Sequence, residues 1–216
     1  MTQFNDHYHE IMTVNQEDKC PFCGITDMLG VYHSKREAYD HYLPKGIYPF
    51  NSINFRNLVP ACHYCNSSYK SSKDLAFTPK DPIGQTHRRR VFYPYSTSGH
   101  EIEISINFKK LDIDCPTSSD VQLTFGPSAL SEEIDTWKEV YSIEERYKAK
   151  CRSKDAKDWL EQVRIFRDEH GIEPKVTLTT VQKQAKKDPM ANSNFLKIAF
   201  LEGCHRIGLW DLNIDL

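Results

Sequence analysis

Apolar and polar residues alternate in the middle of the chain. Between residues 101 and 108 every second position is apolar, and the same period of two returns between residues 121 and 125. Residues 90–95, which precede a Ser-Thr-Ser-Gly turn, have the composition of a further strand. The pattern predicts a small antiparallel sheet that ends at Gly126-Pro127.

The spacing changes to a helical period after residue 127. Apolar positions three and four residues apart predict a helix with Ser131 as its N-cap, and a second helix from about Ser153 to a stop at Gly171. A short basic helix over residues 180–187 and a last helix are expected to follow. The expected buried positions are Ile134, Trp137, Val140 and Tyr141, then Ala156, Trp159, Leu160, Val163 and Phe166, and finally Phe195, Ile198, Ala199 and Ile207.

Periodicity is weaker in the first 80 residues. Residues 1–19 are polar and predict a lead-in segment with about one helical turn. Residues around 36–43 and 56–60 favour short strands. The stretch from His63 to Lys73 lacks glycine and proline and ends in lysines, so it favours a helix. Two short strands followed by a helix are therefore expected in this part.

Length and composition narrow the class of protein. At 216 residues the chain is long enough for one sizeable domain or two small ones. No apolar run approaches the length of a membrane span, and the polar first ten residues do not predict a signal peptide. We therefore expect a cytoplasmic protein, in a reducing compartment, with no membrane partner.

The net charge of −2 hides an uneven distribution. Residues 30–95 contain ten Lys/Arg and four Asp/Glu, an excess of +6, whereas residues 111–216 contain fifteen Lys/Arg and nineteen Asp/Glu, a net −4. Positive charge gathers in the first stretch, where a phosphate backbone could dock. The acidic second stretch suits protein contact better than nucleic acid.

Two CxxC pairs carry the strongest chemical signal. Cys20, Cys23, Cys62 and Cys65 can supply the four thiolates of a structural zinc site, and the 38 residues between the pairs are more than an ordinary zinc ribbon contains. A redox site or an iron–sulfur cluster is the alternative, but the polar residues before Cys20 do not fit the strand that a redox fold needs. The other cysteines, at positions 115, 151 and 204, are expected to be ordinary thiols.

Asp40-His41 lies between the two pairs. A neutral imidazole can take a proton from water at physiological pH, and a neighbouring carboxylate oxygen is a hard ligand for Mg²⁺ or Mn²⁺. Asn66 follows the last cysteine and can add an amide oxygen to the metal shell. Because Lys70 and Lys73 lie four and seven residues further on, we expect all three side chains on one helix face, with the two lysines contacting phosphate. The other candidate contacts to nucleic acid are Lys45, Arg56, Arg88, Arg89 and Arg90.

The segments Asp40-His41-Tyr-Leu-Pro-Lys and Asn57-Leu-Val-Pro-Ala-Cys-His-Tyr-Cys-Asn66 resemble the HNH endonuclease family, with its ββα-metal fold and CxxC/CxxC zinc. The resemblance covers roughly residues 18–75. It implies that His41 is the general base, that Asp40 and Asn66 hold the catalytic metal, and that Asn57 holds the loop between the strands and orients the histidine. Asn66 makes this chain an HNN variant, whose oxygen ligands favour Mg²⁺ or Mn²⁺.

Together, the sequence patterns and this resemblance lead us to expect an α+β fold. A ββα-metal core stapled by a four-cysteine zinc site would occupy residues 1–80, a small antiparallel sheet residues 81–127, and a helical region residues 128–216. The expected activity is metal-dependent hydrolysis of nucleic-acid phosphodiester bonds, in DNA rather than RNA. The alternative is a zinc-ribbon nucleic-acid-binding or adaptor module without catalysis. By analogy, the helical extension resembles nuclease subunits of two-component anti-phage systems, which implies a bacterial defence effector with a protein partner such as an ATPase.

Overall fold

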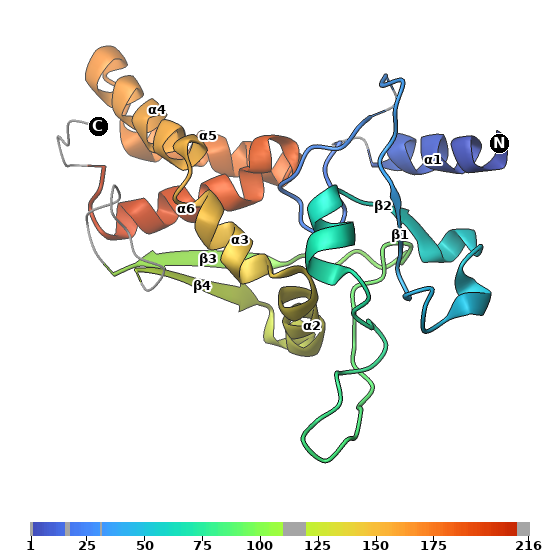
Figure 1. Ribbon diagram of the computed structural model, residues 1–216. Coiled ribbons are helices and arrows are strands. Elements are labelled where there is room, and N and C mark those ends of the chain that lie inside the picture. Colours follow the sequence, from blue (N-terminus) through green and yellow to red (C-terminus); the bar gives the residue numbers. More distant parts are fainter. Residues whose placement is uncertain (1, 16–17, 31, 110–119, 211–216) are drawn as a thin grey trace. The chain divides into compact units, whose positions relative to one another are not determined.

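The computed structural model describes residues 2–15, 18–30, 32–109 and 120–210 (Figure 1). The fold is α+β, and the chain forms two compact units. One unit consists of Met1–Glu101 with Ala129–Ile143, and the other of Ile102–Ser128 with Glu144–Leu216. Each unit is therefore assembled from two separate stretches of the chain, in contrast to the three consecutive segments expected from the sequence.

The first unit begins with an amphipathic helix, α1 (Thr2–Val14). Its inner face carries Tyr8 and Met12, which are four residues apart and almost completely buried. The hydroxyl of Tyr8 donates to the carbonyl of Leu29 at 2.7 Å. The expectation of about one helical turn was therefore wrong, because two apolar positions one turn apart suffice to anchor an otherwise polar helix.

Two short strands and a helix follow, in the predicted order. β1 (Tyr39–His41) and β2 (Leu58–Pro60) pair antiparallel, with His41 opposite Leu58 and Tyr39 opposite Pro60. Two 3₁₀ turns, η1 (Pro49–Asn51) and η2 (Phe55–Asn57), lie in the loop between them. The helix is η3 (Tyr64–Lys70), a π-helix shorter than the expected stretch from residue 63 to 73.

Residues 90–95 do not form the predicted strand. This segment is held instead by tyrosine hydroxyls: Tyr93 donates to the carbonyl of Arg56 at 2.7 Å, and Tyr95 donates to the carbonyl of Leu58. Pro94, which has no N–H group, also weakens a ladder at this point. The aromatic residues that suggested a strand therefore fasten an irregular segment onto the end of the β1–β2 pair.

Helix α2 (Ser131–Tyr141) completes the first unit. Tyr141 stacks on Phe22, with ring centroids 4.9 Å apart and an interplanar angle of 16°. The indole N–H of Trp137 donates to the carbonyl of Phe22 at 2.5 Å. Because Phe22 lies inside the first CxxC pair, α2 packs directly on the cysteine-containing part of the chain. The N-cap is Leu130 rather than the expected Ser131, which is the first helical residue.

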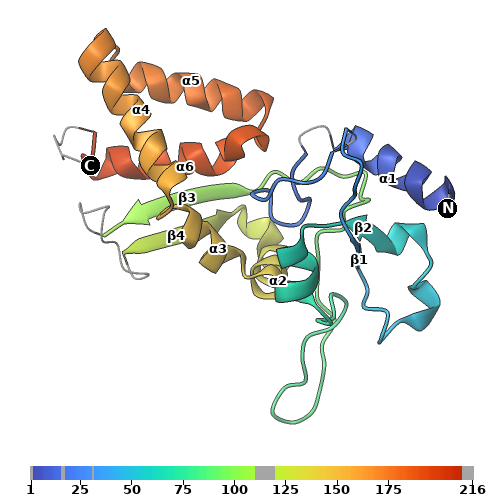
Figure 2. The ribbon, with the colours of Figure 1, turned by 45° about the horizontal axis from the view of Figure 1, so that its top comes forward.

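The second unit combines a β-hairpin with helices. β3 (Glu103–Phe108) and β4 (Val121–Gly126) pair antiparallel, and their inner positions Ile106 and Val121 are almost completely buried. Helix α6 (Asn194–Arg206) lies against β3, and α4 (Lys154–His170) and α5 (Pro174–Lys187) pack on α6 (Figure 2). Gly203 allows the close contact, because a Cβ there would lie 2.5 Å from the carbonyl oxygen of Ile106.

Helix boundaries differ from prediction in two places. The chain breaks at Ser142, which has φ 49°, so α3 (Ile143–Lys150) follows α2 as a separate helix. α5 begins at Pro174, six residues earlier than expected, with the proline in the first turn where its missing N–H costs nothing. Ser153 and Gly171 flank α4 as predicted.

The core of the second unit is only partly the predicted one. In α4, Ala156, Leu160 and Val163 are buried as expected. In α6 the most deeply buried side chains include Leu196 and Phe200, not the expected residues at 195, 198 and 207, which are half-buried.

Two short 3₁₀ turns, η4 (Ser128–Leu130) and η5 (Ala191–Ser193), precede α2 and α6. No helix in the described ranges is both long enough and apolar enough to span a membrane.

Candidate functional site

Four cysteines meet in the interior of the first unit. The sulfur atoms of Cys20, Cys23, Cys62 and Cys65 all lie within 4.8 Å of one another, and each residue is at most 2% exposed. A tetrahedral zinc ion with Zn–S bonds of about 2.3 Å needs sulfur atoms roughly 3.8 Å apart. The prediction that the two CxxC pairs meet in one cluster is confirmed, and the cluster could hold one zinc ion.

Hydrogen bonds and neighbouring thiols shift the pKa values of the cluster cysteines in different directions. The amide of Cys62 donates to the sulfur of Cys20, and the amide of Cys65 donates to the sulfur of Cys62, both at 3.5 Å. Contacts with Cys20 lower the pKa of Cys62 to about 6, while contacts with Cys23 and Cys62 raise the pKa of Cys20 well above its usual value. A cation among the sulfur atoms would make all four thiolates favourable.

Asp40 lies at the centre of β1 and points into the unit. Its carboxylate oxygen Oδ1 accepts a hydrogen bond from the ammonium of Lys70, at 2.9 Å, and the two side chains are 2% and 1% exposed. Lys70 also donates to the backbone carbonyl of His41 at 2.7 Å. The last residue of η3 is therefore joined to two successive residues of β1, which fixes the helix against the strand.

The second carboxylate oxygen of Asp40 is unusual. Oδ2 is buried and has no hydrogen-bond partner among the described residues. Burial raises the pKa of Asp40, and the ammonium of Lys70 opposes the rise without cancelling it. A buried carboxylate oxygen without a partner is costly, and coordination of a hard divalent cation is one way to satisfy it. Asp40, which was expected to hold the catalytic metal, therefore has an oxygen atom that suits a divalent cation.

His41 is the last residue of β1, and its side chain faces the β1–β2 loop, residues 42–57. Its Nε2 atom lies 3.1 Å from the backbone carbonyl oxygen of Ser52. Because a carbonyl can only accept, Nε2 carries the proton of the neutral ring, and Nδ1 then holds the basic lone pair. A half-buried imidazole held in this tautomer is suited to act as a general base at Nδ1.

Asn57 fastens the same loop. Its amide oxygen accepts from the backbone N–H of Leu43 at 2.7 Å, and its amide nitrogen donates to the carbonyls of Leu43 and Asn51, both at 3.1 Å. Asn57 is 4% exposed. These three bonds tie the two ends of the loop together and fix Asn51, which is next to the Ser52 that contacts His41.

Asn66 lies in the first turn of η3 and is half-buried. Its side-chain nitrogen donates to the carbonyl of Tyr39 at 3.4 Å, which places the amide beside the residue that precedes Asp40. The amide nitrogen is thus turned toward β1, and the oxygen is the remaining atom that could ligate a cation. Asn66 and Lys70, expected on one helix face, both point toward β1.

Three of the expected phosphate contacts are occupied by the protein itself. Lys70 is buried in its ion pair with Asp40. Lys73 donates to the last carbonyls of α2, those of Glu139 and Val140, at 3.2 and 3.3 Å. Arg89, with a side chain that is 7% exposed, pairs with Glu139 at 2.6 Å. Lys70 and Arg89 are thus held in ion pairs within the first unit, whereas Lys73 stays exposed beside the end of α2.

The remaining basic candidates are accessible. Lys45, Arg56, Arg88 and Arg90 are exposed. Lys45 and Arg56 belong to the β1–β2 loop, which also holds His41 in place. Arg90 has a side chain that is 67% exposed and lies 3.8 Å from Glu133. The structure therefore leaves two basic side chains on the loop beside the histidine and two further along the chain.

Sequence reasoning missed two parts of this site. The carbonyl of Ser52 leaves no trace in the sequence, because any residue carries a backbone carbonyl. The sequence contained only a weak indication of the ion pair of Lys70. Lys70 was expected on the same helix face as Asn66, and Asp40 was expected to lie opposite that face. A buried lysine needs a buried acid, and Asp40 was the nearest candidate.

Comparison with known proteins gives two partial similarities. No protein-family model and no solved structure matches the chain. Over 63 residues, 29% of the chain, it is 40% identical to protein ea31 of Escherichia phage lambda, covering 19% of that protein. Over 79 residues, 35% of the chain, it is 30% identical to Septu protein PtuB of Bacillus thuringiensis, covering 30% of that protein. The chain thus matches less than a third of the length of either relative.

Proposed function

We propose that the chain is a metal-dependent endonuclease that hydrolyses phosphodiester bonds of nucleic acids. The observation that carries the proposal is the pairing of two unlike groups at the end of one short strand. His41 is held by the carbonyl of Ser52 with Nδ1 as its basic atom, and the adjacent Asp40 keeps one buried oxygen without a hydrogen-bond partner. A module that only binds nucleic acid has no need for this combination.

The residues divide the chemical work. His41 Nδ1 accepts a proton from the attacking water, and Ser52 and Asn57 keep the ring oriented. Asp40 Oδ2 and the amide oxygen of Asn66 would hold a divalent cation such as Mg²⁺ or Mn²⁺, which supplies charge stabilisation at the scissile phosphate. Exposed Lys45 and Arg56 would contact neighbouring phosphates. The four cysteines would hold zinc as a structural staple, distant in role from the reaction.

We further propose a role in bacterial anti-phage defence with a protein partner. The similarity to Septu protein PtuB supports this, and so does the resemblance to nuclease subunits of two-component anti-phage systems. The second unit carries no cluster of three or more potential metal ligands within the described residues, and its role would be contact with a partner such as an ATPase. DNA is the proposed substrate in preference to RNA.

Incubation of the purified protein with plasmid, single-stranded DNA and tRNA tests the activity. Cleavage should require Mg²⁺ or Mn²⁺, and His41→Ala should reduce the rate by on the order of 10²–10⁴-fold, as the loss of a general base does. His33→Ala is the matched control, since His33 is exposed and outside the site. Wild-type cleavage by a folded His41→Ala protein would show that the reaction occurs elsewhere.

A further inference from the structure

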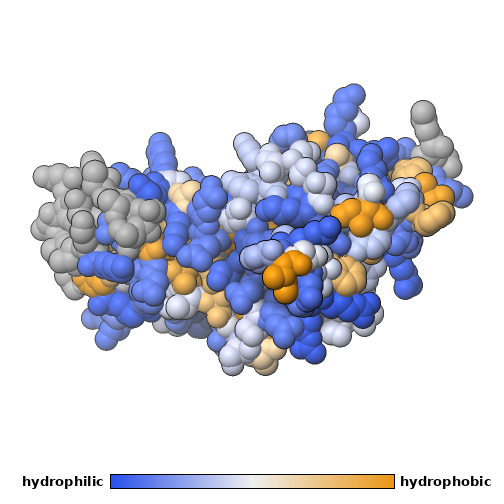
Figure 3. Space-filling model, turned by 60° about the horizontal axis from the view of Figure 1, so that its bottom comes forward, coloured by the Kyte–Doolittle hydropathy of each residue, from blue (hydrophilic) through white to orange (hydrophobic). Residues whose placement is uncertain are grey.

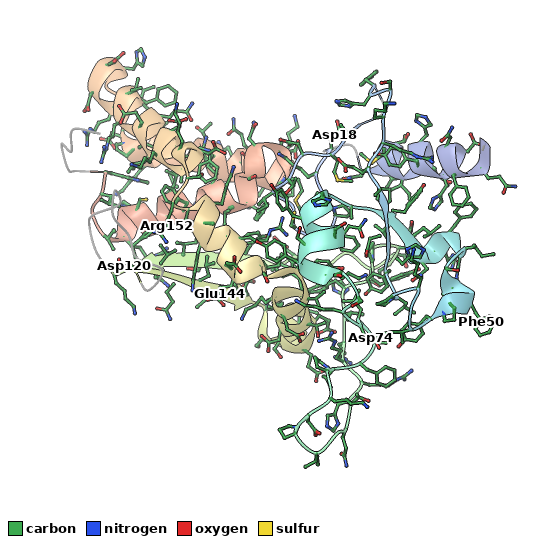
Figure 4. All side chains as sticks on the ribbon, viewed as in Figure 1. Asp18, Phe50, Asp74, Asp120, Glu144 and Arg152 are labelled. Carbon is green, nitrogen blue, oxygen red and sulfur yellow. The ribbon has the colours of Figure 1, made fainter. Side chains whose placement is uncertain are left out.

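The β1–β2 loop carries three large apolar side chains that the protein does not bury. Phe50 is 98% exposed, Ile53 80% and Ile47 52%, all within seven residues. Figure 4 shows Phe50 pointing away from the ribbon of this loop. Small apolar patches on a mostly hydrophilic surface are visible in Figure 3, and single ones need no explanation. Three on one short loop do, because clustered exposed apolar residues mark contact sites.

Hydrogen bonds hold this loop in a defined shape. The amides of Ile47 and Tyr48 donate to the carbonyl of Pro44 at 2.9 and 2.8 Å, and the hydroxyl of Tyr48 donates to Asp74 at 2.9 Å. The side chain of Asn57 fixes the carbonyl of Asn51. Phe50 is therefore presented by a fastened loop, which reduces the entropy lost when it binds a partner.

The loop also contacts the histidine of the proposed site, on the Nε2 side of its ring. Ser52 touches His41 through its carbonyl, and Phe50 is only two residues from Ser52, at most about 7 Å along the backbone. Phe50 therefore belongs to the same fastened loop that contacts His41, within reach of a strand of several nucleotides bound at the histidine.

Charge favours nucleic acid over protein as the occupant. From His41 to Lys73 the sequence contains no Asp or Glu, and the loop itself contributes two exposed cations, Lys45 and Arg56. Aromatic side chains next to basic ones are the composition of surfaces that stack bases and follow a phosphate backbone. A basic protein surface would be repelled by these two cations, whereas a phosphate backbone is attracted to them.

We propose that Phe50, flanked by Ile47 and Ile53, is a stacking platform for an unpaired base in a strand bound at His41, so that the preferred substrate is single-stranded or locally unpaired nucleic acid. The proposal rests on the proposed nuclease function and names its substrate class. Bases in an intact duplex are already stacked on each other, so a platform of this kind rewards only nucleotides that are free to leave the stack.

Binding measurements in the His41→Ala background test the platform without cleavage. Fluorescence anisotropy should show that Phe50→Ala weakens binding of a labelled single-stranded oligonucleotide about tenfold, the loss of one stacked base. Binding of a fully paired hairpin should be weaker and unaffected. Tyr32→Ala is the matched control, because Tyr32 is an equally exposed aromatic residue, 99% exposed, outside the loop. Equal affinities for Phe50→Ala and its parent would overturn the proposal, as would equal losses on both nucleic acids.

A second variant reports contact directly. Phe50→Trp should retain affinity, and its added tryptophan fluorescence should be quenched by the single-stranded oligonucleotide, whereas that of Tyr32→Trp should not. Absence of quenching in Phe50→Trp would also overturn the platform. If Phe50→Ala instead changes only self-association in size-exclusion chromatography, the patch is a protein contact. The two proposals can fail separately. If binding does not depend on Phe50, the platform is wrong, but the wild-type protein can still cleave nucleic acid. If the wild-type protein does not cleave, the nuclease proposal is wrong, but Phe50-dependent binding can still be observed.

Discussion

Lys70 and Asp40 form a buried ion pair, 2.9 Å long, between the end of η3 and the centre of β1. The ammonium satisfies one carboxylate oxygen of Asp40 and leaves the other for a second partner. Because Lys70 also contacts the carbonyl of His41, it positions the backbone of both residues in the proposed site. Lys70 thus lies in a buried ion pair rather than at the surface, where the expected contact with phosphate would need it.

Substitution of Lys70 by methionine should destabilise the fold. Removal of one partner of a buried pair leaves an uncompensated charge, which costs about 3–5 kcal/mol. In urea unfolding, with zinc present and without Mg²⁺, the double variant Lys70→Met/Asp40→Asn should lose less free energy of unfolding than the two single variants added together. Additive losses would show that the two side chains do not stabilise each other.

Zinc content should follow the four cysteines. Protein purified without added zinc should contain about one equivalent, as a closed four-thiolate site implies. Cys62→Ser should lose the metal and the folded first unit together, because thiolate binding is coupled to folding. Cys151→Ser is the control, since Cys151 is buried in the second unit, outside the cluster. A folded, active Cys62→Ser protein without zinc would show that the four cysteines do not form a structural zinc site.

Acid should weaken the contact between α1 and the strands through His7. Burial lowers the pKa of His7, whose Nδ1 lies 2.9 Å from the hydroxyl of Tyr39 and whose ring packs on Phe55; Tyr95 and Glu10 are the other titratable groups near it. In the unfolded chain a histidine titrates near pH 6.5. As pH falls below about 6.5, the unfolded chain gains the proton first, so the free energy of unfolding decreases.

Urea unfolding at pH 7.5 and pH 6.0 measures this effect. The wild-type protein should lose more stability between the two values than His7→Phe, which keeps a ring at the position but cannot titrate. Other titrating groups contribute to both proteins equally. Identical losses in the two proteins would mean that His7 is not the responsible group.

The two-stretch construction of the first unit predicts which fragment folds. Glu103 pairs with Gly126 across the hairpin, so residues 101 and 129 can be joined by a short glycine linker. A protein of residues 1–101 linked to 129–143 should retain zinc and a cooperative unfolding transition. The fragment 1–127, which lacks α2, should not. A stable, zinc-loaded 1–127 fragment would show that α2 is dispensable for the first unit.

Local patterns predicted the elements that carry chemistry. The CxxC spacing led to the four-cysteine cluster, which is confirmed. The β-like stretches around 36–43 and 56–60, and the lack of glycine and proline from His63 to Lys73, led to β1, β2 and η3, which are present in that order. These features are encoded over a short range, by thiols at ligand spacing and by the residues within each short segment. The roles of Asp40, His41, Asn57 and Asn66 in catalysis stay predictions.

What failed depends on contacts distant in sequence. The segment 90–95 has strand composition, but its tyrosines donate to carbonyls more than 35 residues away, and no local pattern encodes those acceptors. The grouping of α2 with the first unit also depends on a distant contact, since Trp137 donates to the carbonyl of Phe22, 115 residues earlier.

Because the chain is synthesised from its N-terminus, the stacking of Tyr141 on Phe22 forms later than the four cysteines are made. The ribosome delivers Cys65, the last of the four cysteines, 76 residues before Tyr141. At about 5–20 residues per second, this interval lasts roughly 4–15 s. During that time the four thiols can capture metal while the helix that later packs beside them does not yet exist. Metal loading would then precede closure, and the nascent chain is the form in which zinc has its easiest access.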